Sequence, residues 1–211
     1  QVLAVDLPGH GRSEGKYLSS IEEMADWIMR LMIELKLKSA ALIGHSMGAL
    51  IALEVGSRYP KNVEKLCLMG VASRMPVHPE LLKAAKKNQP LASDLIMYWG
   101  LGDKAKIGGH PHPGLWVHGA NEILIRNSQS GVLYNDLAAC DSYQGAVQAA
   151  EKVQCSSLFI LGDGDKMTPL KQAKKLTEVM RSPEINIIKD CGHMIMSERP
   201  NEVSKNLKAF I

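Results

Sequence analysis

The 211-residue sequence predicts an α/β fold in which a mostly parallel sheet is covered by helices on both faces. Two observations support this class. Short apolar segments with strand character alternate with longer segments whose apolar residues recur at three- and four-residue steps. Glycine-containing loops that carry serine, aspartate or histidine follow several of the predicted strands, at the sheet edge where α/β proteins gather functional groups.

The first third of the chain predicts three strands and two helices. Each predicted strand is a short apolar run, and each predicted helix has apolar residues on one face. The first helix begins at a capping box, because serine is followed three residues later by glutamate. The order is a strand over residues 2–7, a helix that begins at Ser20 and Glu23, a strand over 40–44, a helix over 47–59 and a strand over 63–71.

This regular alternation stops at residue 73 and resumes near residue 142. The intervening segment contains prolines at 76, 79, 90, 111 and 113 and only short helical patterns, such as residues 79–87. We expect it to be a cap, over residues 73–141, inserted into a core made of residues 1–72 and 142–211. The core continues with a helix through Val153, a strand over 157–161, a helix over 170–180, a strand over 185–188 and a helix from Asn201 onward.

Composition excludes several classes of function. The net charge of +3 comes from lysines scattered along the chain, so no dense basic run predicts a nucleic-acid partner. No segment approaches the ~18 consecutive apolar residues of a membrane span. The four cysteines have no metal-ligand spacing, and we expect reduced thiols in a cytoplasmic protein. We expect no cofactor and no metal, and we interpret His110, His112 and His118 as exposed loop residues.

The sequence Gly44-His45-Ser46-Met47-Gly48 is a G-x-S-x-G motif between a predicted strand and a predicted helix. We expect a sharp turn there, at which side chains in place of Gly44 or Gly48 would clash with nearby backbone. The turn places Ser46 at a helix N-terminus, where free N–H groups stabilise developing negative charge. Ser46 is therefore the candidate nucleophile, and the Met47 N–H is a candidate oxyanion donor.

A serine nucleophile needs a base, and the base needs an acid that orients it. Two loops after later strands offer these groups: one contains both Asp163 and Asp165, and the other contains His193. The chain order of serine, aspartate and histidine is that of the α/β hydrolases. The residues alone leave open which of the two aspartates is the acid.

The chain resembles the α/β-hydrolase superfamily over essentially its whole length. The matching segments, in order, are Asp6-Leu7-Pro8-Gly9-His10-Gly11-Arg12-Ser13, Gly44-His45-Ser46-Met47-Gly48, Gly162 with Asp165 and Pro169, and Gly192-His193. In that superfamily the acid stands three residues after the glycine of its loop. The resemblance therefore implies Asp165 as the acid, Asp163 as a turn residue, and a catalytic triad of Ser46, Asp165 and His193.

The resemblance also implies a gap before the first matching segment. Members of the superfamily carry several dozen residues there, including a strand that lies between this chain's first two and a His-Gly loop that supplies a second oxyanion donor. Nothing in the chain matches that loop. The chain is then either a fragment of a longer protein or a reduced variant whose sheet closes up, and we expect the fragment, with an N-terminally incomplete fold. His10-Gly11 is the nearest substitute, although in the superfamily it mainly shapes the site.

The expected function is hydrolysis of an ester, thioester, lactone or related carbonyl bond of a small apolar substrate, through an acyl-enzyme on Ser46. The alternatives are an acyltransferase or C–C bond hydrolase with the same triad, and a ligand-binding protein with slow or no turnover. The candidate substrate contacts are His45, Met194, Trp99 and Trp116, of which the two tryptophans could equally pack as the core of the cap. The sequence leaves the oligomeric state open.

Overall fold

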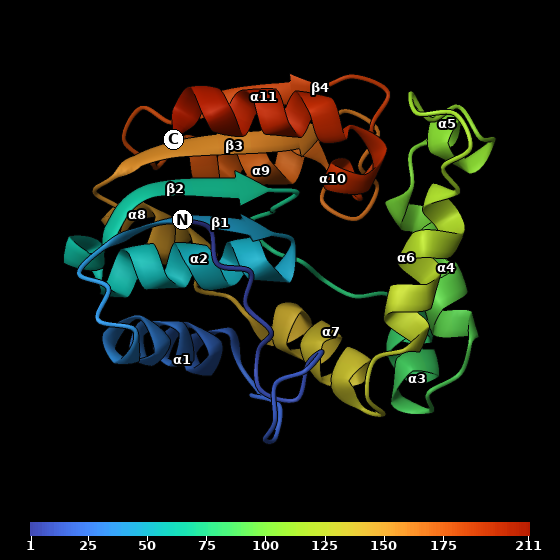
Figure 1. Ribbon diagram of the computed structural model, residues 1–211, viewed down its shortest axis with the longest axis horizontal. Helices are drawn as coiled ribbons and strands as arrows, with labels where there is room; N and C mark the ends of the chain where they lie inside the picture. The colour runs from blue at the N-terminus through green and yellow to red at the C-terminus, as the bar shows by residue number, and fades with distance from the viewer.

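The computed structural model describes residues 1–211, and at its centre lies a sheet of four parallel strands in the order β1-β2-β3-β4. Figure 1 shows the strands side by side, with the helices stacked on either side. Apart from one register shift at the start of β1, the pairing is regular, and Leu66 of β2 lies opposite Leu42 of β1 and Ser157 of β3. The predicted α/β class is therefore confirmed. The strands are β1 (Ala40–His45), β2 (Val63–Met69), β3 (Ser156–Gly162) and β4 (Glu184–Ile188).

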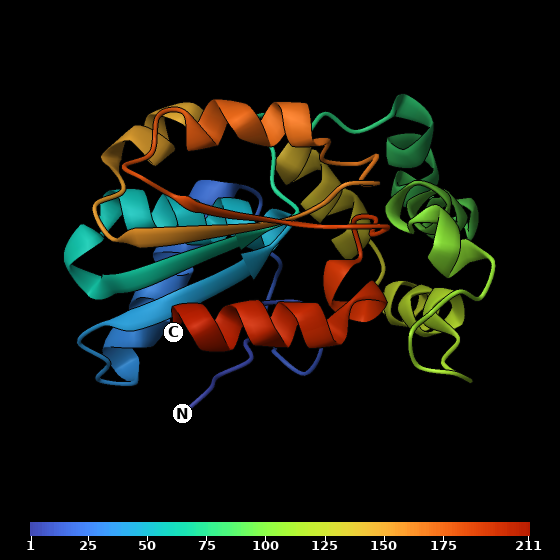
Figure 2. The same ribbon diagram turned by 90° about the horizontal axis from the view of Figure 1, so that it is seen from above.

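The two central strands bury both of their faces, because successive side chains of a strand point in opposite directions. Leu66 and Leu68 belong to the larger apolar cluster, whereas Cys67 and Met69 belong to a second cluster on the other face. Helices α1, α2, α8 and α9 contribute to the larger cluster, and α11 covers the second one (Figure 2). These helices are α1 (Ile21–Glu34), α2 (Met47–Arg58), α8 (Ala146–Lys152), α9 (Leu170–Thr177) and α11 (Pro200–Phe210).

Helix α1 begins where the capping pattern predicted, with one change in the hydrogen bonds. The Ser20 Oγ accepts the Glu23 N–H at 3.2 Å, as in a capping box. The Glu23 carboxylate accepts from the N–H and the hydroxyl of Ser19, each at 2.9 Å, and not from the N–H of Ser20. The cap thus satisfies the first turn of α1 and fixes the point at which the exposed N-terminal segment joins the helix.

The predicted strand over residues 2–7 is wrong. These residues form no ladder, and Val2 and Val5 are 92% and 42% exposed. A strand needs a neighbour to satisfy its backbone groups, and β1 is paired only with β2, so its other edge carries no strand. The segment instead attaches to the molecule farther along, where His10 Nε2 lies 2.7 Å from Asp136 of helix α7 (Val132–Ser142).

Residues 73–141 contain more helix than the sequence predicted. The five helices of this segment are α3 (Pro79–Lys86), α4 (Leu91–Gly100), α5 (Asp103–Lys106), α6 (Val117–Arg126) and α7 (Val132–Ser142). Helices α3 to α6 gather beyond the carboxyl ends of the strands (Figure 1) and share their own apolar cluster around Leu81, Met97 and Leu101. Helix α7 joins the two parts, since Leu137 packs on that cluster while Ala139 belongs to the main core.

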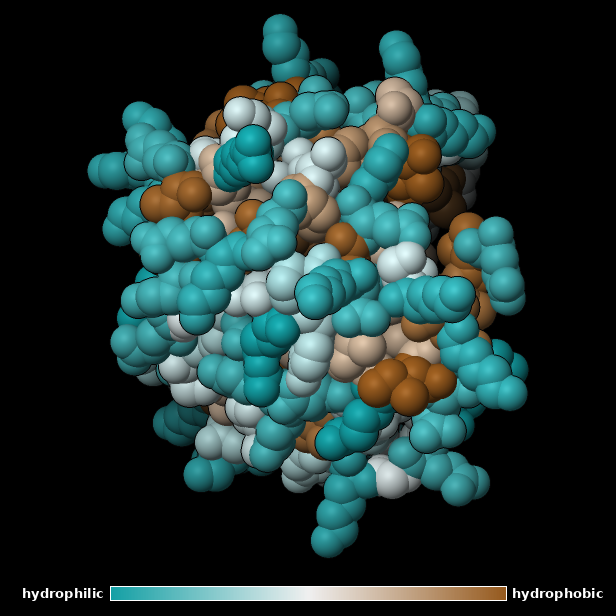
Figure 3. All heavy atoms as spheres, turned by 90° about the vertical axis from the view of Figure 1, so that its left-hand side faces the viewer, coloured by the Kyte–Doolittle hydropathy of each residue, from teal (hydrophilic) through white to brown (hydrophobic).

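Two short helices complete the structure, the 3-10 turn η1 (Pro60–Asn62) and α10 (Ile195–Glu198). None of the helices combines the length and the apolar character needed to span a membrane. Figure 3 shows the face opposite helices α3 to α6, where hydrophilic side chains dominate and hydrophobic ones are scattered. Scattered apolar residues of this kind are ordinary on a protein surface and do not indicate a partner.

Candidate active site

Ser46 occupies a strained turn between β1 and α2. Its backbone has φ 53° and ψ −118°, outside the regions that side chains usually adopt. The Ser46 N–H donates to the carbonyl of Met69 at the end of β2, over 2.9 Å, which ties the turn to the sheet. A residue held in such a conformation persists only where its surroundings enforce it, so the turn fixes the Ser46 side chain at the sheet edge.

The two glycines of the motif differ in what they allow. A Cβ at Gly44 would lie 2.1 Å from the carbonyl oxygen of Gly48, so only glycine fits there. A Cβ at Gly48 would meet no heavy atom within 4 Å outside its own helical neighbourhood. The expected clash at Gly48 is therefore wrong, because its Cβ position faces open space next to the first turn of α2.

The structure brings Ser46, His193 and Asp165 together, although 147 residues separate the first from the second. The Ser46 Oγ lies 2.8 Å from Nε2 of His193, and Nδ1 of the same ring lies 2.8 Å from Oδ2 of Asp165. An ionised carboxylate only accepts hydrogen bonds, so Nδ1–H is the donor and Nε2 is left free to accept from the serine. This is the geometry that a serine nucleophile, a base and an orienting acid require.

Asp165 is buried, and its carboxylate accepts several hydrogen bonds from its own loop. One oxygen accepts the N–H groups of Met167 and Thr168, at 2.9 and 2.7 Å, and the other accepts the Thr168 hydroxyl at 2.6 Å. Burial would raise the pKa of Asp165, but the hydrogen bonds and charge of His193 and the bonds from Thr168 outweigh it and hold the pKa below its usual value. The carboxyl is therefore ionised at neutral pH, as the orienting role requires.

The other aspartate of this loop lies apart from the cluster of Ser46, His193 and Asp165. Asp163 is exposed, and its Oδ1 accepts the N–H of Cys191 at 3.3 Å. Its backbone N–H donates to the carbonyl of Ile188 at the end of β4. Asp163 thus ties the loop after β3 to the loop that carries His193, and Asp165 is the aspartate next to the imidazole.

His45, which the sequence offered as a substrate contact, lies against His193. Its Nε2 donates to the backbone carbonyl of His193 over 2.7 Å, and the two ring centres are 4.8 Å apart. Burial and the neighbouring His193 lower the pKa of His45 to about 3, so the ring is neutral in ordinary buffers. With its donor engaged in this way, His45 helps to hold the histidine loop.

The other candidate substrate contacts differ in where they lie. Met194 is half-buried, and its Cε is 3.1 Å from the point where a Cβ of Gly100 would stand. Trp99 packs on the cluster of α3 to α6, with its ring centre 5.3 Å from that of His78, so it belongs to the core of these helices. Trp116 is 69% exposed and lies over His118.

The two candidate oxyanion donors lie in different parts of the chain. The Met47 N–H stands in the first turn of α2, where backbone N–H groups have no partner within the helix. His10, the nearest substitute for a second donor, bonds the Pro8 carbonyl and Asp136 of α7. The structure therefore ties the His10-Gly11 turn to α7, and its hydrogen bonds do not lead to Ser46.

Sequence reasoning missed two residues that form hydrogen bonds at this site. The Thr168 hydroxyl lies 3.1 Å from Nδ1 of His193 as well as 2.6 Å from Asp165. Glu198 is fully buried and accepts hydrogen bonds from the N–H groups of Gly102 and Gly192. The position of Thr168 three residues after an aspartate is a turn signal that could have indicated the first contact. No sequence pattern indicates the second, because it joins segments 96 residues apart.

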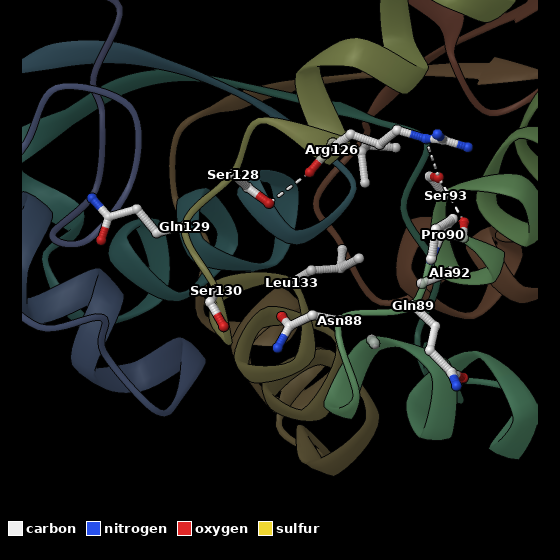
Figure 4. Close-up of a pocket in the computed structure, with 12 residues that line it drawn as sticks. Asn88, Gln89, Pro90, Ala92, Ser93, Arg126, Ser128, Gln129, Ser130 and Leu133 are labelled. Carbon is white, nitrogen blue, oxygen red and sulfur yellow. Dashed lines mark hydrogen bonds between the residues drawn. The ribbon is translucent and has the colours of Figure 1, made fainter.

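A separate hollow of about 330 Å³ lies among helices α3, α4 and α6 and the loop that leads to α7 (Figure 4), and it contains none of Ser46, Asp165 or His193. Its one charged lining residue is Arg126, whose Nε donates to Ser93 at 3.2 Å. The same guanidinium is paired with Asp94 and Glu122, so its charge is already balanced. We interpret this hollow as a packing gap between helices.

Comparisons with known proteins show which family and which fold the chain shares. The family model of serine aminopeptidase, S33, matches residues 1–200. An (E)-2-((N-methylformamido)methylene)succinate hydrolase of Acinetobacter baylyi is 22% identical over 217 residues, covering 100% of this chain and 80% of its own. A pimeloyl-[acyl-carrier protein] methyl ester esterase of Neisseria meningitidis is 27% identical over 210 residues, covering 91% of this chain and 75% of its own.

Among solved structures, the enol-lactonase of Burkholderia xenovorans superposes with a TM-score of 0.85 at 21% identity. The superposition covers 97% of this chain and 78% of the enol-lactonase, and it establishes the shared fold. The family model spans nearly the whole chain, and the relatives that match it include esterases and other hydrolases. The chain therefore belongs to the serine aminopeptidase S33 family of α/β-fold hydrolases, and it is a hydrolase enzyme.

Proposed function

We propose that this hydrolase cleaves an ester, thioester, lactone or related carbonyl bond of a small apolar substrate through an acyl-enzyme on Ser46. One observation carries the proposal: a continuous hydrogen-bonded line runs from Ser46 Oγ through His193 to Asp165, with both contacts at 2.8 Å. A serine hydroxyl without such a base is a poor nucleophile at neutral pH. The esterases among the relatives support the same bond type.

In the first half of the reaction, His193 Nε2 takes the proton of Ser46 while the oxygen attacks the substrate carbonyl. The negative charge that forms on the carbonyl oxygen is stabilised by the Met47 N–H and by the positive end of α2. When the intermediate collapses, the imidazolium gives its proton to the departing alcohol or thiol. The acyl group remains on Ser46.

In the second half, a water molecule replaces the leaving group. His193 takes a proton from the water, the resulting hydroxide attacks the acyl carbonyl, and the proton then returns to the Ser46 oxygen as the acid departs. Asp165 stays ionised throughout and stabilises the charged imidazole without taking its proton. The donors around Asp165 support this role, because they favour its charged form.

Apolar side chains near the triad favour an apolar acyl group. Met47 follows the nucleophile directly, and the ends of Met194 and Met167 both lie beside Gly100. Methionine side chains adapt to ligands of different shape, which suits a pocket of broad acceptance. We assign Trp99 to the packing of the cap and propose that residues 73–141 cover the site.

The four cysteines are free thiols, which supports a reducing compartment such as the cytoplasm.

The experiment compares turnover of short-chain p-nitrophenyl esters by the chain and by Ser46→Ala. The serine side chain is small and makes no cap bond to α2, so the substitution should leave thermal unfolding nearly unchanged. Turnover should fall below about one hundredth of the wild-type value. A variant that keeps more activity than this would exclude Ser46 as the nucleophile.

A further inference from the structure

Glu198 is a buried carboxylate that the reaction does not use. It lies at the end of α10 with none of its surface exposed, and the neighbouring Arg199 donates to its backbone carbonyl and not to its carboxylate. Its Oε2 accepts the N–H groups of Gly102 and Gly192, each at 3.0 Å, and its Oε1 accepts the Gly192 N–H at 3.1 Å. Withdrawing a carboxylate from water is costly, and the N–H groups of Gly102 and Gly192 offset part of that cost.

The two glycines that Glu198 binds belong to the two segments that enclose the base. Gly192 directly precedes His193, whereas Gly102 follows the end of α4. The same segments also bond each other directly, because the N–H groups of His193 and Met194 donate to the carbonyl of Gly100 at 2.6 and 3.3 Å. The carboxylate thus completes a clamp between the histidine loop and helix α4.

The fit of the clamp leaves no room for adjustment. A Cβ at Gly192 would lie 2.3 Å from the backbone nitrogen of Gly102, and a Cβ at Gly102 would lie 2.8 Å from Oε2 of Glu198. The two backbones therefore approach as closely as glycines permit. The histidine loop has little freedom along this direction while the carboxylate holds both N–H groups.

We infer that Glu198 is a positioning residue, which holds His193 in line with Ser46 by clamping Gly192 to Gly102. The expected loss of turnover rests on the proposed function. The position of the imidazole, which the clamp sets, does not depend on that function. A carboxylate that only stabilised the fold would affect unfolding alone. A positioning residue affects the rate of the chemical steps and the hydrogen bond between His193 and Asp165, with little effect on substrate binding.

The test compares Glu198→Ala with Val203→Ala, a matched control that removes buried packing in the neighbouring helix α11 without touching the clamp. At a temperature where both variants are folded, we expect kcat for a short-chain ester to fall at least tenfold in Glu198→Ala, with KM within threefold. Val203→Ala should keep kcat within threefold of wild type. The second readout is the low-field proton resonance of the His193 Nδ1–H, which should shift or broaden only in Glu198→Ala.

Glu198→Gln covers the case in which Glu198→Ala fails to fold. Its amide keeps one acceptor oxygen, so we expect kcat and the resonance to fall between those of wild type and of Glu198→Ala. Wild-type kcat and an unshifted resonance in a folded Glu198 variant would overturn the inference. If the wild-type protein turns over no ester, the proposed function fails, and the resonance alone decides whether Glu198 positions His193.

Discussion

The backbone N–H of His193 donates to the carbonyl of Gly100 over 2.6 Å, so the loop that carries the candidate base is bonded directly to the last residue of helix α4. The two residues come from different parts of the molecule, since α4 lies in the segment that interrupts the alternation of strands and helices. Helix α4 is therefore in direct contact with the loop that carries His193. Part of the geometry of the base depends on this helix.

The two aspartates of the loop after β3 give a direct test of the acid. Asp165→Asn should lower kcat on the order of 10⁴-fold, because the amide would no longer enforce the tautomer in which His193 accepts from Ser46. Asp163→Asn is the control, since its side chain can still accept from the Cys191 N–H, and its kcat should stay within about threefold of wild type. Ester turnover of the two variants measures both effects. The reverse order would assign the acid to Asp163.

The two glycines of the motif should respond in opposite ways to alanine. Gly44→Ala drives a Cβ into the Gly48 carbonyl, so we expect destabilisation of about 3 kcal/mol or more, beyond ordinary overpacking. Gly48→Ala places a methyl group in open space within α2, where alanine is favoured over glycine by up to about 1 kcal/mol. Urea unfolding at neutral pH compares them. Similar destabilisation by both substitutions would contradict the open surroundings of Gly48.

His10 and Asp136 should make stability depend on pH in a defined direction. The hydrogen bond to Asp136 raises the pKa of His10 above its usual value of 6.5, against the opposing effect of burial. Because the folded pKa is the higher one, the pair stabilises the protein fully below pH 6.5, and this contribution is lost as pH rises through the folded pKa. Asp136→Asn should therefore lower the free energy of unfolding at pH 6 by about 1 kcal/mol, and by less at pH 9.

Asp94→Asn is the control for this pH dependence. Asp94 pairs with Arg126, a cation that stays charged between pH 6 and pH 9. Its removal should change the free energy of unfolding by a small and equal amount at both values. If Asp136→Asn behaves in the same way, the pair does not gain stability from protonation of His10.

The sheet and the loops after its strands could be predicted because they follow from local patterns. The apolar runs that became β1 to β4 are recognisable in the sequence, and Ser46, Asp165 and His193 stand in the loops or turns that follow strands. Residues 2–7 show the limit of such patterns. They have the apolar character of a strand, but a strand also needs a neighbour, and pairing depends on the rest of the sheet.

Contacts between distant segments could not be predicted from the sequence, for a similar reason. The clamp of Glu198 depends on the close approach of Gly102 and Gly192, which follows from the packing of α4 against the histidine loop and leaves no periodic trace in the sequence. The open surroundings of Gly48 also depend on tertiary packing, which the sequence pattern does not show. Backbone rules alone therefore assigned both glycines of the motif the same role, although they differ.

The most direct test of an acyl-enzyme on Ser46 is labelling with a fluorophosphonate probe, followed by peptide mapping in a mass spectrometer. An activated Ser46 oxygen displaces fluoride and keeps the phosphonyl group, so the account predicts one adduct per chain, on the peptide that contains Ser46. The adduct should be absent in Ser46→Ala and form far more slowly in Asp165→Asn. An adduct on another residue, or an unlabelled Ser46 in a folded protein, would contradict the account.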